Sequence, residues 1–165
     1  MHSRIFQFSR KKIEKNDYYD AERYYNGERG YFAGEYADIA EYVDDDTDRI
    51  NDIKYLGEHL AGIVEFISED CFKIINKKKY FEKKYQNFLK AVENLQNITE
   101  KEYINGNNKS LIRELEESYS EKFDYYFDEY DQTAYIEFFG PMDDFMRKVQ
   151  DGEIYYIGSS IDYDY

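Results

Sequence analysis

The residues of this chain that could do chemistry are mostly carboxylates, and their spacing is more informative than their number. Between residues 111 and 131, six of them step by three, four, three, four and three residues: Glu114, Glu117, Glu121, Asp124, Asp128 and Asp131. If this segment is one α-helix, all six lie on one face over ~25 Å, or one charge per ~5 Å. One strand of duplex DNA carries a phosphate every ~3.4 Å, a density of the same order. The spacing therefore predicts an acidic stripe that could imitate a nucleic-acid backbone.

Two other interpretations of this segment stay open. Charge runs are usually solvated helix faces, although like charges at helical spacing cost roughly 0.2–0.5 kcal/mol per pair. The aromatic run Phe123, Tyr125, Tyr126 and Phe127 could instead form a strand, which would remove the stripe.

A second acidic cluster lies earlier in the chain and consists of Glu41, Asp44, Asp45, Asp46, Asp48 and Asp52. Its centre resembles the opening of a calcium-binding loop. However, Arg49 stands where such a loop needs glycine, and Tyr55 stands where it needs a bidentate Glu. The cluster is therefore either a second contact surface for a partner or a solvated connection between helices, since acids also favour a helix N-terminus.

Catalytic and metal-binding patterns are scarce. The only histidines are His2 and His59, and His59 is expected to be a partly buried structural residue. The single cysteine, Cys71, excludes an internal disulfide and a cysteine-based zinc cluster, and it suits a reducing cytosol. The chain has no catalytic triad spacing, phosphate loop or HExxH motif. We expect no enzyme activity, cofactor or metal, although a carboxylate-based hydrolase stays a third possibility.

The charge of the chain is unevenly distributed. Of its 165 residues, 36 are Asp or Glu and 22 are Lys or Arg, so the net charge is -14. Residues 1–16 and 73–90 are basic strips, which we expect to solvate the protein, to neutralise acids within the chain or to meet a second copy in a homodimer. Such an acidic body repels nucleic acid and anionic membranes and attracts basic protein surfaces. The absence of an apolar run of ~20 residues and of a signal peptide predicts a cytoplasmic protein.

The elements that must position these charges follow from hydrophobic spacing and turn signals. In chain order we expect a strand at 3–9, a loop at 16–30, a helix at 36–43, a helix at 47–60, a hairpin or a strand leading into a helix at 63–75, a helix at 81–95, a short helix capped by Thr99 and Glu102, a helix from Leu111 capped by Ser110, a helix at 142–149 and a closing hairpin at 154–165. With 20 Tyr and 12 Phe for a core, residues 1–165 are predicted to form a single α+β domain. Its middle should be helical, and its sheet should be small, mostly antiparallel and built from the N-terminal strand and the C-terminal hairpin.

The two ends of the chain carry a resemblance to a known class of proteins. Residues 4–9 (Arg-Ile-Phe-Gln-Phe-Ser) and 156–163 resemble the ends of small acidic uncharacterised proteins of bacterial mobile elements. In size, acidity and aromatic content the chain is also similar to antirestriction and anti-CRISPR proteins that imitate nucleic acid. The resemblance implies a non-enzymatic protein that blocks a basic nucleic-acid-binding groove of a host defence protein. The alternative is a structural or regulatory module that binds its partner through the aromatic loop 18–36, with acidity serving only solubility.

Overall fold

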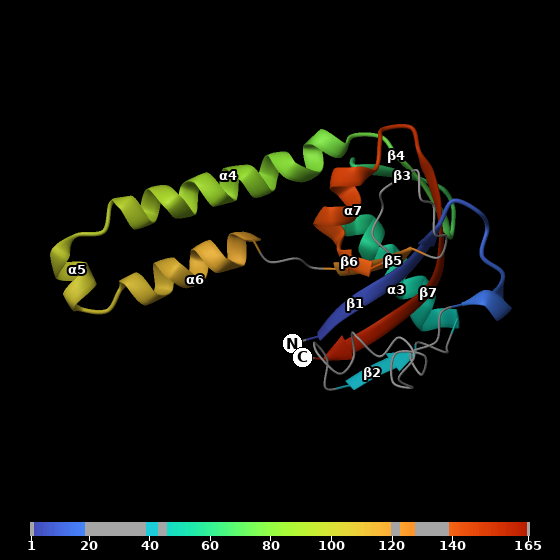
Figure 1. Ribbon diagram of the computed structural model, residues 1–165, viewed down its shortest axis with the longest axis horizontal. Coiled ribbons are helices and arrows are strands. Elements are labelled where there is room, and N and C mark those ends of the chain that lie inside the picture. The colour runs from blue at the N-terminus through green and yellow to red at the C-terminus, as the bar shows by residue number, and fades with distance from the viewer. Residues whose placement is uncertain (1, 19–38, 43–45, 120–122, 128–138, 165) are drawn as a thin grey trace. The chain divides into compact units, whose positions relative to one another are not determined.

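The computed structural model describes residues 2–18, 39–42, 46–119, 123–127 and 139–164 (Figure 1). The chain divides into two compact units. The first, called the sheet unit here, consists of Met1–Lys77 and Glu121–Tyr165, and the second, called the helical unit, consists of Lys78–Ser120. We describe each unit by itself; that the whole chain folds as one domain stays a prediction.

The strands described in the sheet unit form one mixed sheet. They are β1 (His2–Ser9), β2 (Ile39–Tyr42), β3 (Val64–Ser68), β4 (Cys71–Ile74), β5 (Phe123–Phe127), β6 (Phe139–Pro141) and β7 (Ile154–Asp164). Six of them follow the order β3-β4-β7-β1-β5-β6, and β2 pairs additionally with β7. The α+β class is therefore confirmed. The prediction of a small, mostly antiparallel sheet was wrong. The sheet has more strands than expected, and it is mixed because β1 and β5 pair in parallel.

The neighbouring positions of the two chain ends are confirmed. β1 pairs antiparallel with β7, with Ile5 opposite Ile161, and with β5 on its other side. Ile5 to Ser9 are all buried, as expected for a strand with neighbours on both edges and cover on both faces. The predicted closing hairpin is wrong, because residues 154–164 form one strand of 11 residues. Its central Gly158 and Ser159 are buried and bonded to the rest of the sheet unit instead of forming a turn.

Residues 39–42 were predicted to lie in a helix, but they form the strand β2. β4 pairs with β7 only over Tyr156 to Ile154, so it leaves the backbone groups of the second half of β7 without a neighbour on that side. β2 supplies that neighbour, with Ile39 opposite Asp164 and Tyr42 opposite Ile161. Buried backbone groups need hydrogen-bond partners, so sheet pairing outweighs a weak helical spacing over four residues.

Two helices accompany the sheet, and both were predicted. α3 (Asp46–His59) buries Ile53 and Leu56 and is followed by Gly62 in the left-handed region at φ 73°. α7 (Met142–Lys148) begins directly after Pro141, which is its N-cap residue and has an extended backbone. The hairpin prediction for residues 63–75 is also confirmed by β3 and β4. A short 3-10 helix, η1 (Lys15–Asp17), follows β1.

The core of the sheet unit is aromatic. The ring of Phe145 on α7 lies 4.8 Å from that of Phe8, 5.1 Å from that of Tyr125 and 5.0 Å from that of Tyr155. Phe72 joins this cluster through Phe8 at 5.2 Å. Tilted and edge-on ring pairs at these separations add to the stabilisation from burial alone, which explains the use of so many Tyr and Phe residues.

The helical unit is formed by α4 (Lys77–Gln96), α5 (Glu100–Ile104) and α6 (Asn108–Tyr119). α4 confirms the predicted helix at 81–95. The predicted capping box is present, with Thr99 Oγ1 accepting from the Glu102 N–H and the Glu102 carboxylate accepting from the Thr99 N–H at 2.8 Å. α6 begins three residues before the predicted Leu111, and Ser110 does not cap it, since its hydroxyl donates to the Asn107 carbonyl.

We predict that Gly158→Ala destabilises the protein by about 2–4 kcal/mol. A Cβ at Gly158 would overlap the Gln7 side-chain amide and approach Ile13 Cδ1 to 2.9 Å, so it would displace a buried hydrogen bond. Urea unfolding measures the change. The control is Gly106→Ala, where φ is 81° and no atom lies within 4 Å of the added Cβ, so only backbone strain of ~1–2 kcal/mol is expected. Equal losses for the two variants would contradict the packing argument.

Candidate partner-binding surface

The predicted acidic stripe at 114–131 is not formed, because residues 111–131 are not one helix. α6 ends at Tyr119, and Phe123–Phe127 is the strand β5 between β1 and β6. Phe123, Tyr125 and Phe127 alternate along it, each 2% exposed or less. Aromatic residues at a period of two bury one face of a strand, and this burial outweighs the helical spacing of the acids.

The acids of the stripe consequently do not continue along one helix. Glu114 and Glu117 are exposed on α6, where Glu114 accepts from Asn94 Nδ2 at 3.2 Å and Glu117 accepts from Arg113 Nε at 2.9 Å. Asp124 lies on β5 and is half-buried. Glu121, Asp128 and Asp131 lie outside the described residues.

In the second acidic cluster, the two acids whose burial is described, Asp48 and Asp52, do not share a surface. Asp52 is 7% exposed; its carboxylate pairs with Arg4 Nε at 2.5 Å and accepts from Ser160 Oγ at 2.7 Å. Asp48 is exposed on α3. Glu41 lies in β2 and Asp46 begins α3, while Asp44 and Asp45 lie outside the described residues. Asp52 therefore belongs to the interior of the sheet unit and is unavailable to a partner.

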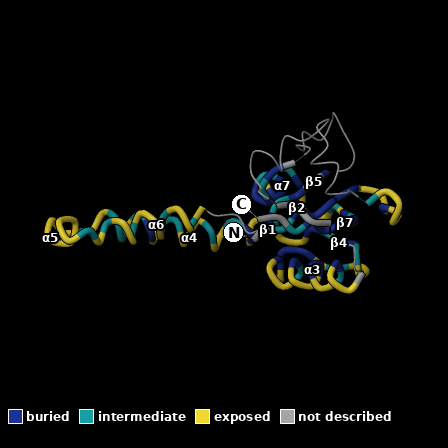
Figure 2. Tube along the Cα trace, turned by 90° about the horizontal axis from the view of Figure 1, so that it is seen from below, coloured by how far each residue is buried: buried dark blue, intermediate teal, exposed yellow. Residues whose placement is uncertain are grey.

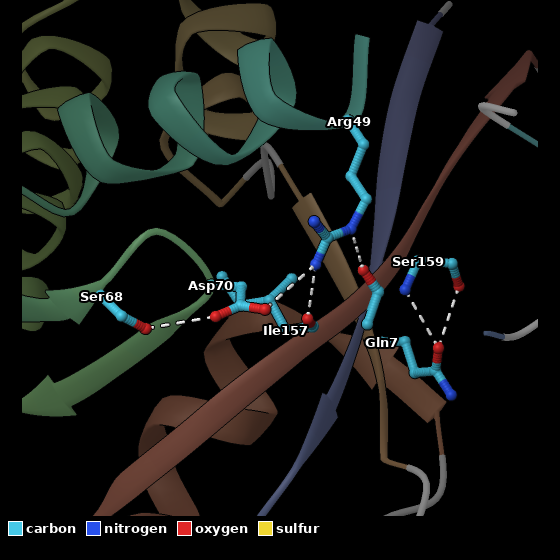
Figure 3. A network of polar contacts seen from close by, with 7 residues as sticks. Gln7, Arg49, Ser68, Asp70, Ile157 and Ser159 are labelled. Atoms are coloured by element: carbon cyan, nitrogen blue, oxygen red, sulfur yellow. Dashed lines mark hydrogen bonds and ion pairs between the residues drawn. The ribbon is translucent and has the colours of Figure 1, made fainter. Parts of the chain in front are cut away.

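Beside Asp52, the side chain of Arg49 enters the interior of the sheet unit (Figure 3). Its Nε donates to the Gly158 carbonyl at 2.5 Å and its Nη2 to the Ile157 carbonyl at 2.8 Å. Nη2 also lies 3.9 Å from Asp70 Oδ2, and the guanidinium stacks over the Tyr18 ring at 4.9 Å from its centroid. This buried cation satisfies carbonyl groups at the middle of β7.

Gln7 completes the same region from β1. Its Oε1 accepts from the Ser159 N–H at 3.0 Å and from Ser159 Oγ at 3.1 Å (Figure 3). Its Nε2 donates to the Asp17 carbonyl at 3.1 Å. The cluster of Gln7, Arg49, Asp52, Ser159 and Ser160 is here called the polar centre of β7. Each member has a partner within the chain, so its role is to hold β7 in place.

The sequence analysis missed the role of Arg49, although a signal was available. Arg49, Ile53, Leu56 and Leu60 step by four, three and four residues, so the arginine lies on the apolar face of its helix. A charged residue at such a position needs an internal partner. Asp52, three residues later, belongs to the same side and was counted among exposed acids instead.

The charge is divided between the units in a way that the sequence alone did not reveal. The helical unit holds seven of the 36 acids and eight of the 22 bases, so it is nearly neutral. The sheet unit holds the remaining 29 acids and 14 bases, a net charge of -15. The whole negative surplus of the protein therefore lies on the sheet unit.

The arginines described in the sheet unit are bound by its own oxygen atoms. Arg4 pairs with Asp52, Arg10 lies 3.7 Å from Glu153, and Arg147 contacts Asp144 at 2.8 Å and Asp143 at 3.5 Å. Arg49 is bound within the polar centre of β7. Each such pair neutralises one acid and one base, so the excess negative charge of the sheet unit is carried by its other acids. Those that the structure describes as exposed are Glu14, Asp17, Asp48, Glu58, Glu65, Glu69 and Asp151.

The described residues offer little for catalysis or metal binding. None of their His, Cys, Asp and Glu side chains gather in a group of three that could hold a metal ion. His59, which was expected to be partly buried, is exposed at the end of α3, with its ring 5.2 Å from that of Phe123. Burial and the neighbouring Glu153, which accepts from the Tyr155 hydroxyl at 2.7 Å, raise the pKa of Tyr155.

Among the described helices, none has both the length and the apolar character needed to cross a membrane.

Of the aromatic loop 18–36, only Tyr18 is described. Its ring lies under the Arg49 guanidinium, so this tyrosine takes part in the sheet unit's own packing. Residues 19–36, including Tyr24, Tyr25 and Tyr31, lie outside the described residues, and their role in partner binding stays a prediction.

Comparisons with known proteins do not extend these observations. No protein-family model, curated protein or solved structure matches the chain. The function proposed below is therefore argued from the geometry and the charge of the chain itself.

We predict that Asp52→Asn destabilises the protein by about 1–3 kcal/mol, because it leaves Arg4 without its counter-charge in a mostly buried position. Chemical denaturation measures the loss. Asp48→Asn, four residues earlier and exposed on the same helix, is the matched control and should cost less than ~1 kcal/mol. If both variants lose the same stability, Asp52 is not the structural residue described here.

A pH-dependent prediction concerns Cys71, which is buried. Burial first, and the nearby Asp70 second, raise the pKa of its thiol. The folded protein therefore holds the thiol proton more tightly than the unfolded chain, and this stabilisation is complete below ~pH 8.5 and is lost as pH rises through the raised pKa. Urea unfolding at pH 8 and pH 10 should show a smaller loss of stability for Cys71→Ala than for the parent protein; an identical loss would refute the assignment.

Proposed function

We propose that this protein is a non-enzymatic acidic interaction protein that binds a basic, nucleic-acid-binding surface of another protein. The observation that supports the proposal is the charge division: the sheet unit has a net charge of -15, and its described arginines contact its own carboxylate or carbonyl oxygens. A cationic groove that evolved to hold phosphates would be attracted by such a surface. A host defence protein that binds DNA or RNA is a partner of this kind.

The acids that would take part differ from those of the predicted stripe. The exposed acids of the sheet unit would contact the partner in place of the stripe. Glu114 and Glu117 lie in a nearly neutral unit and bond to polar neighbours within it. The interaction would then depend on the summed field of the sheet unit and not on a fixed pitch along one helix.

Strong salt dependence is the first expected result. The Debye length falls from ~10 Å at 0.1 M to ~3 Å at 1 M salt, so contacts between exposed charges weaken steeply. The immobilised protein, incubated with a nuclease-treated bacterial lysate, should retain nucleic-acid-binding proteins that elute as salt is raised. The purified partner should lose labelled duplex DNA or RNA when this protein is added. Retained proteins that do not bind nucleic acid, or binding unaffected by salt, would contradict the proposal.

Charge reversal then distinguishes the two acidic surfaces. The triple change Asp48→Lys, Glu58→Lys and Glu69→Lys alters the sheet unit at exposed positions and should weaken partner binding by at least about tenfold. The triple change Glu114→Lys, Glu116→Lys and Glu117→Lys alters the charge equally on α6 and should have a smaller effect. The reverse ranking would place the partner on α6, and equal effects would show that only the net charge matters.

A further inference from the structure

The first residue of α4 is bonded to the segment that connects α7 to β7. α4 begins at Lys77, which still belongs to the sheet unit. The Lys77 N–H donates to Asp151 Oδ1 at 2.8 Å. Its ammonium group donates to the carbonyl of Arg147 at 2.5 Å and to that of Val149 at 2.9 Å. All three bonds lie within the sheet unit and join the first turn of α4 to the end of α7 and to residues 149–153, here called the 149–153 connection.

Through these bonds, two helix ends satisfy each other. The first N–H groups and the last carbonyl groups of a helix have no partner within that helix. Asp151 accepts from one such N–H at the start of α4, and the Lys77 ammonium binds two carbonyls at the end of α7. Each charge also lies at the helix end whose dipole favours it. These contacts of Lys77 and Asp151 are here called the reciprocal cap.

The sequence of α4 does not itself favour a helix that starts at this position. Its first turn begins with Lys77, Lys78 and Lys79 and contains no acidic residue, although the N-terminus of a helix favours negative charge and disfavours positive charge. The first turn is also the costly step of helix formation. Asp151, which lies 74 residues further along the chain, supplies the carboxylate that the first turn lacks. The start of α4 therefore depends on the sheet unit.

The 149–153 connection is held firmly in the sheet unit. Val149 is fully buried, at 0% exposed. The Gly152 N–H donates to the Ile74 carbonyl at 2.7 Å, and the Ile74 N–H donates to the Glu153 carbonyl at 2.9 Å. Asp151 is thus positioned by the residues on either side of it, and its carboxylate is in place whether or not the residues beyond Lys77 are helical.

The helical unit beyond Lys77 has little core of its own. Tyr80 and Ala91 are the only buried residues of α4, and no residue of α5 or α6 is buried. Figure 2 shows the same pattern, with α4 and α6 mostly exposed or intermediate. Most of the stability of helices in proteins comes from packing of an apolar face, since short helices are only marginally stable in water. The helical unit is therefore expected to be much less stable than the aromatic core of the sheet unit.

We propose that the helical unit unfolds locally while the sheet unit stays folded, and that the reciprocal cap controls how often it does so. Segments with few buried contacts open at a lower free energy than the whole protein. Opening begins in α5 and α6, which bury no residue, and ends at Lys77, which the sheet unit holds. Because Asp151 is exposed, a change at one surface carboxylate alters the folding of three helices. This conformational device is separate from the binding proposed above.

Hydrogen exchange of the full chain, followed by mass spectrometry, tests the proposal. In the parent protein, peptides from residues 78–119 should exchange at least about 100-fold faster than those of β1 and β7. Asp151→Ala should increase exchange in residues 78–96 by about a further tenfold, as expected for a lost helix cap, and should leave β1 and β7 unchanged. Equal protection of the two units in the parent protein, or unchanged exchange of α4 in Asp151→Ala, would overturn the proposal.

Two control variants separate capping from charge. Glu69→Ala removes an exposed acid from another turn of the sheet unit and should not change the exchange of α4. Asp151→Asn removes the charge but keeps Oδ1 as an acceptor, so it should retain most of the protection of the parent protein. If Asp151→Asn exchanges as fast as Asp151→Ala, or if Glu69→Ala has the same effect, the cap is not the cause.

A matched pair of lysine variants tests the other half of the reciprocal cap. Lys77→Met keeps the apolar stem but loses both bonds to the α7 carbonyls, so it should increase exchange at the start of α4. Lys78→Met, at the next position and exposed, should not. Equal exchange in the two variants would contradict a role for the Lys77 ammonium. These measurements use the protein without a partner, so they can fail or succeed independently of the salt-sensitive binding.

Discussion

The sheet unit depends on the hydrogen-bond partners of the buried polar groups in the middle of β7. This strand pairs with β1, β2 and β4, and its residues 157–161 are all buried. Buried carbonyl and hydroxyl groups without partners would cost ~1–3 kcal/mol each. Arg49 from α3 and Gln7 from β1 supply those partners, and Asp52 binds both Ser160 and Arg4. The contacts join the first strand, the last strand and the helix between them, so the chain ends cannot separate without exposing them.

This arrangement gives the charged residues two different roles. Acids and arginines that face the interior of the sheet unit pair with each other and contribute to its structure. Acids outnumber bases in this unit by 29 to 14, and this surplus gives the unit its negative field. In the helical unit, acids and bases nearly balance, and Tyr85, Leu89, Ile112 and Tyr119 are exposed among them. The negative surplus of the chain and its nearly neutral helices therefore belong to different units.

Much of the local structure was predictable because it depends on neighbours in sequence. The step of three and four residues through Phe81 and Phe88 gave α4, and Thr99 with Glu102 gave the capping box. Pro141 marked the start of α7. The prediction failed at residues 39–42 and at the turn expected within residues 154–164, and residues 123–127 were left open between helix and strand. The conformations of these three segments depend on distant strands. For Phe123–Phe127, the acids step helically while the aromatic residues alternate, and only burial against β1 decides between the two patterns.

By itself, the sequence determined the composition-based properties: an acidic chain, rich in Tyr and Phe, with a single cysteine and a mixture of helices and strands. These properties can be read without any knowledge of contacts, because net charge and composition are sums over the residues and are the same in every fold. The tertiary structure decided which acids are available to a partner. Asp52 and Asp48 lie four residues apart on one helix, yet the first is buried beside Arg4 and the second is exposed. The contacts of Asp52 with Arg4, 48 residues before it, and with Ser160, 108 residues after it, make that distinction, and no local spacing encodes them.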